Sequence, residues 1–351
     1  MGLAVAASTQ PERGTARPAA ASAMLLADGR LHLHHGPIDL VIGADGTPAA
    51  VKRAYRLAAA RFSTILDELV GELDLLRRPL CQTSCRPAGD VAARMWAASM
   101  RHLAHHNGAD YVTAMAAVAG AVADEILAVI CDKADLDRAY VNNGGDIALF
   151  LNPAAASRQE FSIGICADPD IVFRSFDDSA ASAMRPVPEW QDGFAGTIRV
   201  SAADQIGGIA TSGWKGRSHS LGIADLVTVL APNAAAADVA ATLIANAVLP
   251  DAAAGESWHG IERRPAHELA PDSDLRSRLV TVAVDALPDD VITAALHRGA
   301  AVARQMCQSG TILAAYGVLQ GHGFHCNAPT GKAKAKPAPA VKTVCAESQT
   351  A

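Results

Sequence analysis

Residues 138–151 read RAYVNNGGDIALFL and place a hairpin near the middle of the chain. A short extended run, a tight Asn/Gly turn and a second extended run predict two antiparallel strands. Three segments before this hairpin, 49–78, 90–106 and 113–131, carry apolar residues at helical spacing and predict helices. The 113–131 segment is apolar nearly all round, which is typical of a central, buried helix.

Strand signals dominate the next part of the chain. They fall at 160–166, 170–175, 196–202, 206–211 and 224–231. A helix with Asn233 as its N-cap follows, and the ordered part ends in a strand–helix–strand pattern. Helices first, then strands, then a mixture favour an α+β fold over a strictly alternating α/β sheet. We expect mixed or antiparallel sheets packed with helices in a single large domain.

Composition argues against several classes of function. The chain has 351 residues, a formal net charge of -6 and 4% aromatic residues. It therefore lacks the basic face and stacking platforms of nucleic-acid binders. No run of about 18 apolar residues is free of charges or helix breakers, so we expect no membrane helix. Seven scattered cysteines and no signal-peptide pattern at the N-terminus predict a cytoplasmic protein with reduced thiols.

The two ends of the chain differ from the middle. Residues 1–22 have no sustained apolar pattern, and residues 327–351 are rich in Lys, Ala and Pro. Such segments cannot bury enough apolar surface to fold alone, so we expect both to be disordered. The predicted folded domain spans 23–326.

A first candidate site lies in the helix sequence DVAAT, where Asp238 and Thr242 are four residues apart. This spacing places a carboxylate and a hydroxyl on one helical face, one turn apart. Both are oxygen ligands of the kind that Mg²⁺ or Ca²⁺ takes. The alternative is an Asp that interacts with the helix dipole and an ordinary Thr.

A second candidate is the NNGGD turn, with Asn143, Gly144, Gly145 and Asp146. Its glycines permit positive φ angles and close approach of the backbone to a ligand. Neither the dinucleotide-binding pattern nor the Walker A spacing occurs in the chain. An ordinary hairpin turn remains the alternative.

A third candidate is the segment 211–220, TSGWKGRSHS. Its Ser212, Lys215 and Arg217 are of the types that contact phosphate or carboxylate groups. His219 is a candidate acid or base. A solvated hairpin loop is the alternative reading of the same residues.

A zinc site is a further alternative. Cys81 and Cys85 precede His102, His105 and His106, and all five are residue types that bind zinc. Structural zinc sites usually show tighter, paired spacing, so this pattern is weak.

Four segments resemble, in sequence and order, the core of the ApbE superfamily: MAAVAGAVADEIL, YVNNGGDIAL, GIATSGWKGRSHS and ADVAATLIANAV. The chain looks most like the cytosolic ApbE-like branch, which diverges from the FAD:protein FMN transferases. Such transferases use Mg²⁺, cleave FAD and attach FMN to a Thr of a target protein. Members of the ApbE-like branch tend to accompany tetrahydromethanopterin-type one-carbon metabolism, which implies a role in making or handling that cofactor.

The resemblance implies roles for particular positions. Asp238 and Thr242 match the metal ligands, and a backbone carbonyl in Ala117–Gly120 would complete that site. The remaining matched positions would line the flavin or nucleotide site: Gly144, Gly145, Asp146, Thr211, Ser212, Gly213 and His219.

Two parts of the transferase pattern are missing. Ala119 stands where the pattern has Lys, and the segment after His219 runs towards a strand without an Asp-Pro-Arg-Thr-Gly loop. We therefore expect an enzyme, of the transferase or cofactor-biosynthesis type, that binds a phosphorylated or pterin- or flavin-like small molecule, with Mg²⁺ as the expected metal. FMN transfer and a non-catalytic ligand-binding or scaffold role remain alternatives. We expect a small-molecule substrate with an anionic group and no nucleic-acid or membrane partner; a homo-oligomer stays open.

Overall fold

The structure is a computed structural model that describes residues 20–81, 85–103, 111–155, 160–166, 194–216, 218–250, 260–328, 335–337 and 342–343. The predicted strand at 170–175, most of the N-terminal lead and most of the C-terminal tail lie outside these residues.

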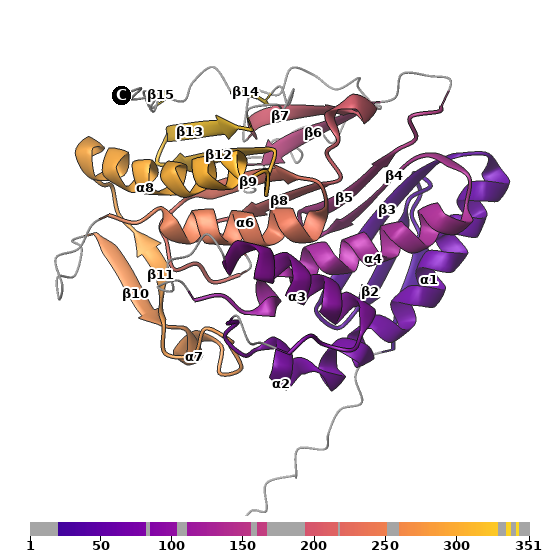
Figure 1. Ribbon diagram of the computed structural model, residues 1–351. Helices are drawn as coiled ribbons and strands as arrows, with labels where there is room; N and C mark the ends of the chain where they lie inside the picture. The colour runs from indigo at the N-terminus through magenta and orange to yellow at the C-terminus, as the bar shows by residue number, and fades with distance from the viewer. Residues whose placement is uncertain are drawn as a thin grey trace, which may run out of the picture.

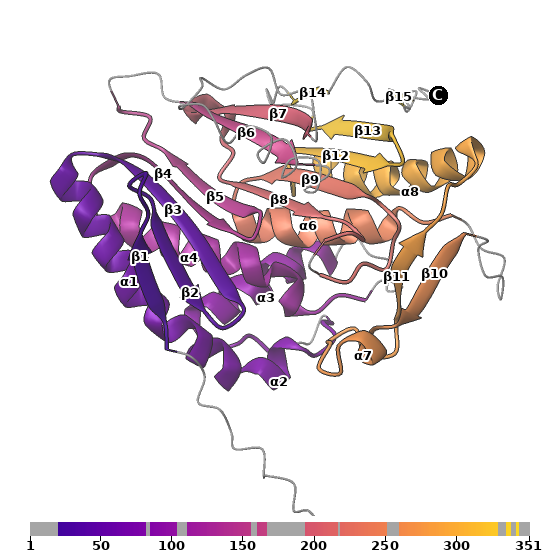
Figure 2. The same ribbon diagram turned by 180° about the vertical axis from the view of Figure 1, so that it is seen from behind.

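One large sheet organises the molecule (Figures 1 and 2). Ten strands form it, and every neighbouring pair is antiparallel except β13 and β15. In spatial order they are β1 (Ser22–Leu25), β2 (Leu31–His35), β3 (Ile38–Gly46), β4 (Leu136–Asn143), β5 (Asp146–Leu151), β8 (Gly208–Ser212), β9 (Leu226–Ala231), β12 (Ala314–Leu319), β13 (His322–Asn327) and β15 (Lys342–Thr343).

Helices cover one face of this sheet (Figure 1). They are α1 (Pro48–Gly71), α2 (Leu73–Leu76), α3 (Asp90–Leu103), the 3₁₀ turn η1 (Ala114–Ala117), α4 (Val118–Lys133), α6 (Ala234–Ala247) and α8 (Asp289–Gln308). The opposite face packs against the small sheet of β6 (Glu160–Cys166), β7 (Phe194–Ser201) and β14 (Ala335–Pro337). At one end lie β10 (Ile261–Pro265), α7 (Ala266–Leu269) and β11 (Leu279–Val284); η2 (Ala202–Asp204) follows β7.

This architecture confirms the predicted α+β class, with a large antiparallel sheet packed with helices in a single body. The NNGG hairpin joins β4 and β5 as expected. Asn233 caps α6, since its side-chain Oδ1 accepts a hydrogen bond from Ala236 N at 2.9 Å. The predicted helix at 49–78 is divided at Glu72 into α1 and α2.

Disorder of the C-terminal tail stays a prediction, and two short described pieces of the tail pair with strands. Ala335–Pro337 pairs with β7, and Lys342–Thr343 pairs with β13. Strand addition at a sheet edge uses backbone hydrogen bonds, so a short segment without large apolar side chains can still pair there. At the other end, Ser22 already belongs to β1 and not to a disordered lead.

One helix bears on the expectation that the chain has no membrane helix. Ala114–Lys133 is long and apolar enough to span a bilayer, but 56% of its apolar window is buried inside the protein. It contacts α1, α3, α6, β4 and β5. Packing on several sides explains its composition, which is compatible with a soluble fold.

Small residues allow α6 to lie very close to its neighbours. A Cβ added to Gly208 would come within 2.1 Å of the backbone at Asn233 and Ala234. A Cβ added to Gly120 would come within 2.3 Å of Ala234 O. These contacts press β8 and α4 onto the first turn of α6.

We expect Gly208→Ala to lower the free energy of unfolding by about 3 kcal/mol, because backbone must move to admit the methyl group. Gly71→Ala is the matched control, since nothing lies within 4 Å of a Cβ there. Urea unfolding of both variants measures the difference. Equal stability of the two variants would show that β8 and α6 separate at little cost.

Candidate functional site

Three segments that are far apart in the sequence meet at the start of α4. Asn143, the last residue of β4, donates from Nδ2 to Ala119 O at 3.0 Å. The next residue of α4, Gly120, donates its N–H to Asp238 Oδ2 at 3.0 Å. The end of β4 and the middle of α6 are therefore fixed to the same turn of α4.

The NNGGD turn ends at an acidic residue, Asp146, close in sequence to Asn143. Gly144 and Gly145 have φ angles of 65° and 112°, which glycine adopts without strain. Gly145 N donates to Asn142 Oδ1 at 2.8 Å. A Cβ on Gly145 would meet nothing within 4 Å, so the backbone there is open. Asp146 follows as the first residue of β5.

Asp146 and Asp238 form an acidic pair. Burial raises the pKa of Asp146 to about 7, although the N–H of Thr211, 3.3 Å from its Oδ1, favours the charged form. Burial first, and then the negative charge of Asp146, raise the pKa of Asp238 well above its usual value. The Gly120 N–H opposes that shift and Asp124 adds to it. Two carboxylates held this way favour a shared proton or a bound cation.

The hydroxyls near the pair divide between the two faces of the sheet. Thr211 shares the face of Ile209, away from the helices, and its Oγ1 lies 2.9 Å from Thr228 Oγ1. Ser212, one residue on, is on the helix side by the same alternation. Thr242 lies one turn beyond Asp238 on α6, on the same helical face.

Asp225, just before β9, fixes the segment that follows β8 through contacts with Trp214 and Lys215. Trp214 Nε1 and Lys215 Nζ lie 3.3 and 3.2 Å from Asp225 Oδ1, and Gln320 N donates to Oδ2 at 2.6 Å. Gly213 is required here, because a Cβ would come within 2.3 Å of Asp225 O. The side chain of Lys215 is 56% exposed, so a ligand can reach it, but its positive charge is already paired with Asp225.

His219 is exposed on this loop. The residues that follow it are anchored at the far end of α6, where Leu221 N donates to Asn246 Oδ1 at 2.8 Å. Within the described ranges, no hydrogen bond or ion pair links His219 to Asp146 or Asp238. Its acid–base role stays a prediction. Arg217 lies outside the described residues.

One acid near the site was not singled out from the sequence. Asp124 lies one turn after Gly120 on α4, and its oxygens accept the N–H groups of Ala234 and Ala235 at 2.9 and 2.8 Å. Burial raises its pKa to about 6. No local pattern in the sequence marks Asp124, because its partners at the start of α6 are about 110 residues away in the chain.

The zinc alternative gains no support. Among the residues that the structure describes, no group of three or more His, Cys, Asp or Glu side chains could hold a metal. His105 and His106 lie outside those residues. The acidic pair has two such side chains, and its further oxygen donors would come from Thr242 and backbone.

Fold and site together define an α+β protein in which a glycine turn is followed by one of two electrostatically coupled, buried carboxyl groups. A family model described as AbpE bacteria matches residues 23–325, most of the chain, and the chain belongs to this family. Membership agrees with an ApbE-related resemblance, while the particular branch stays a prediction.

A UPF0280 protein of Methanothrix thermoacetophila is also similar. It is 32% identical over 164 residues, which make up 47% of this chain and 58% of that protein. The match thus spans less than two thirds of the relative's length.

Proposed function

We propose that this protein is an enzyme that uses Mg²⁺ to bind and act on a small molecule with a phosphate or similar anionic group. The observation that carries the proposal is the acidic pair: Asp146 directly follows the open glycine turn, and its charge raises the pKa of Asp238. Both carboxylates have raised pKa values, and a divalent cation would neutralise their mutual repulsion.

The residues present fit Mg²⁺. Asp146, Asp238 and Thr242 supply hard oxygen donors, and Mg²⁺ sites in proteins commonly use one or two carboxylates with waters and substrate oxygens. When bound, the ion would stabilise negative charge on a phosphoryl or carboxyl oxygen of the ligand. The Gly120 N–H holds Asp238 in place, and the Thr211 N–H holds Asp146.

The ligand would lie against the NNGG turn. Gly145 presents open backbone, and Ser212 lies on the helix side of the neighbouring strand. His219 is our candidate for moving a proton, and Arg217 for contacting the anion. Lys215 would have to exchange part of its contact with Asp225 for a contact with the ligand.

The family resemblance extends the proposal to a biological setting. A pterin or flavin fits the expected ligand class, and tetrahydromethanopterin-type one-carbon cofactor biosynthesis in the cytoplasm is the proposed process. FAD:protein FMN transfer is the second candidate, supported by the same acidic pair. Ala119, in place of Lys, weighs against it.

Native mass spectrometry of the purified full-length protein tests the proposal. We expect a co-purifying flavin, pterin or nucleotide that is retained with Mg²⁺ and lost after chelation. Asp238→Asn should lose the ligand, whereas Asp67→Asn, an exposed change on α1, should keep it.

Three outcomes separate the candidates. Transfer of FMN from added FAD to a Thr of an acceptor protein would establish the second candidate. A ligand that binds equally well without Mg²⁺ and in Asp238→Asn would overturn the metal-dependent mechanism. If Asp238→Asn and Thr242→Ala leave function in the cell intact, a non-catalytic binding or scaffold role is favoured.

A further inference from the structure

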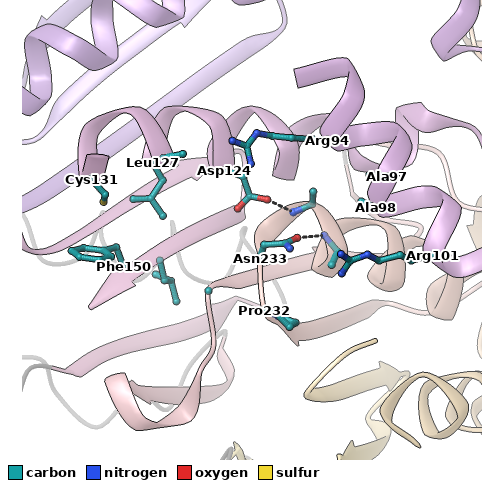
Figure 3. Close-up of a pocket in the computed structure, with 15 residues that line it drawn as sticks. Arg94, Ala97, Ala98, Arg101, Asp124, Leu127, Cys131, Phe150, Pro232 and Asn233 are labelled. Carbon is teal, nitrogen blue, oxygen red and sulfur yellow. Dashed lines mark hydrogen bonds between the residues drawn. The ribbon is translucent and has the colours of Figure 1, made fainter. Parts of the chain in front are cut away.

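A cavity of about 410 Å³ lies between α3, α4 and the start of α6 (Figure 3). Ala97 and Ala98 of α3, Leu127 and Cys131 of α4, and Phe150 of β5 supply apolar walls. Neither Asp146 nor Asp238 lines it, so it is distinct from the acidic pair. Its size falls in the range of sites for small organic ligands.

Two arginines of α3 reach into this cavity. Arg94 and Arg101 are seven residues apart and share one helical face, with about 10.5 Å of axial rise between them. Figure 3 shows Arg94 directed towards Asp124 and Arg101 directed towards the first turn of α6. Their guanidinium groups therefore flank the cavity from one side.

These guanidinium groups keep unused donors. Arg94 donates from Nε to Glu125 Oε2 at 2.9 Å, and no acceptor in the described part of the chain engages its two terminal nitrogens. For Arg101, no hydrogen bond or ion pair forms with any described residue. The cavity acid, Asp124, is occupied by the N–H groups of Ala234 and Ala235.

We infer that this cavity binds a second small molecule, an organic acid whose apolar or aromatic body packs against Leu127 and Phe150. Its anionic group, a carboxylate or a phosphate, is held by Arg94 and Arg101. Arginine suits both groups because its planar fork donates two parallel hydrogen bonds. The apolar walls favour a body such as a ring, which excludes water from the ion contact.

Isothermal titration calorimetry with 1-naphthyl phosphate, 1-naphthoate and neutral 1-naphthol tests this inference. At least one anion should bind at least tenfold more tightly than 1-naphthol. Arg101→Gln should weaken that anion about tenfold, the size of one charge-assisted hydrogen bond. The tighter of the two anions identifies the group as phosphate or carboxylate.

Two further variants serve as a charge control and as a cavity-filling control. Arg56→Gln, at an exposed position on α1, removes the same charge away from the cavity and should leave affinity unchanged. Ala97→Phe fills the cavity from an exposed position and should abolish binding of all three probes. The inference is overturned if no probe binds, if 1-naphthol binds as tightly as the anions, or if Arg56→Gln and Arg101→Gln have equal effects.

Discussion

Adding Mg²⁺ at pH 8 is expected to raise the thermal unfolding midpoint of the wild-type protein by about 5 °C at free ion about 100-fold above the dissociation constant. Asp146, with a pKa of about 7, is then charged. The ion therefore binds a negatively charged site in the folded state and stabilises it. The unfolded chain does not hold Asp146 and Asp238 together and binds the ion weakly. Differential scanning calorimetry with and without the ion measures the shift.

Matched variants assign this shift to the pair. Asp238→Asn keeps an oxygen that can accept the Gly120 N–H but removes the charge, so it should lose most of the shift. Asp67→Asn removes an exposed charge on α1 and should retain all of it. An unchanged shift in Asp238→Asn would mean that Mg²⁺ binds elsewhere.

Without divalent cations, Asp146→Asn is expected to become more stable than the wild-type protein as the pH rises. The pKa of Asp146 is about 7 in the folded state against a usual value of 3.8. The folded protein therefore binds a proton that the unfolded chain has released. The contribution of Asp146 to the free energy of unfolding is fully present below about pH 4 and is lost as the pH rises through about 7.

The free energy of unfolding of Asp146→Asn can exceed that of the wild type by at most about 4 kcal/mol from this cause, since each pKa unit corresponds to about 1.4 kcal/mol. We expect roughly half of that or more when urea unfolding of Asp146→Asn and wild type is compared at pH 5 and pH 8. Asp67→Asn is again the control and should show no pH-dependent difference. Addition of Mg²⁺ should remove the advantage of Asp146→Asn, because the ion compensates the same charges. A pH-independent difference between Asp146→Asn and wild type would show that the carboxyl has an ordinary pKa in the folded protein.

Local patterns were enough to predict most elements of the fold. A tight hairpin turn requires positive φ angles, which glycine adopts without strain, and the turn falls at Gly144 and Gly145. Asn233 caps α6 because a side-chain oxygen there can reach the N–H three residues on. The apolar segment 113–131 is central because a helix without a polar face must be covered on several sides. Among the strands that were not predicted, β14 pairs with β7, which is distant in the sequence, and β15 pairs with β13. β13 forms a hairpin with the neighbouring strand β12, so its local signal was missed.

The sequence by itself determined that a carboxylate and a hydroxyl share one face of α6, and that Asp146 follows a glycine turn. Those relations span a few residues, so backbone geometry fixes them. Only the tertiary structure decided that the charge of Asp146 acts on Asp238, that Thr211 turns its hydroxyl away from them, and that Asp225 engages Lys215. The physical reason is that pKa shifts and ion pairs depend on through-space distance and burial, which arise when β5, β8 and α6 pack together.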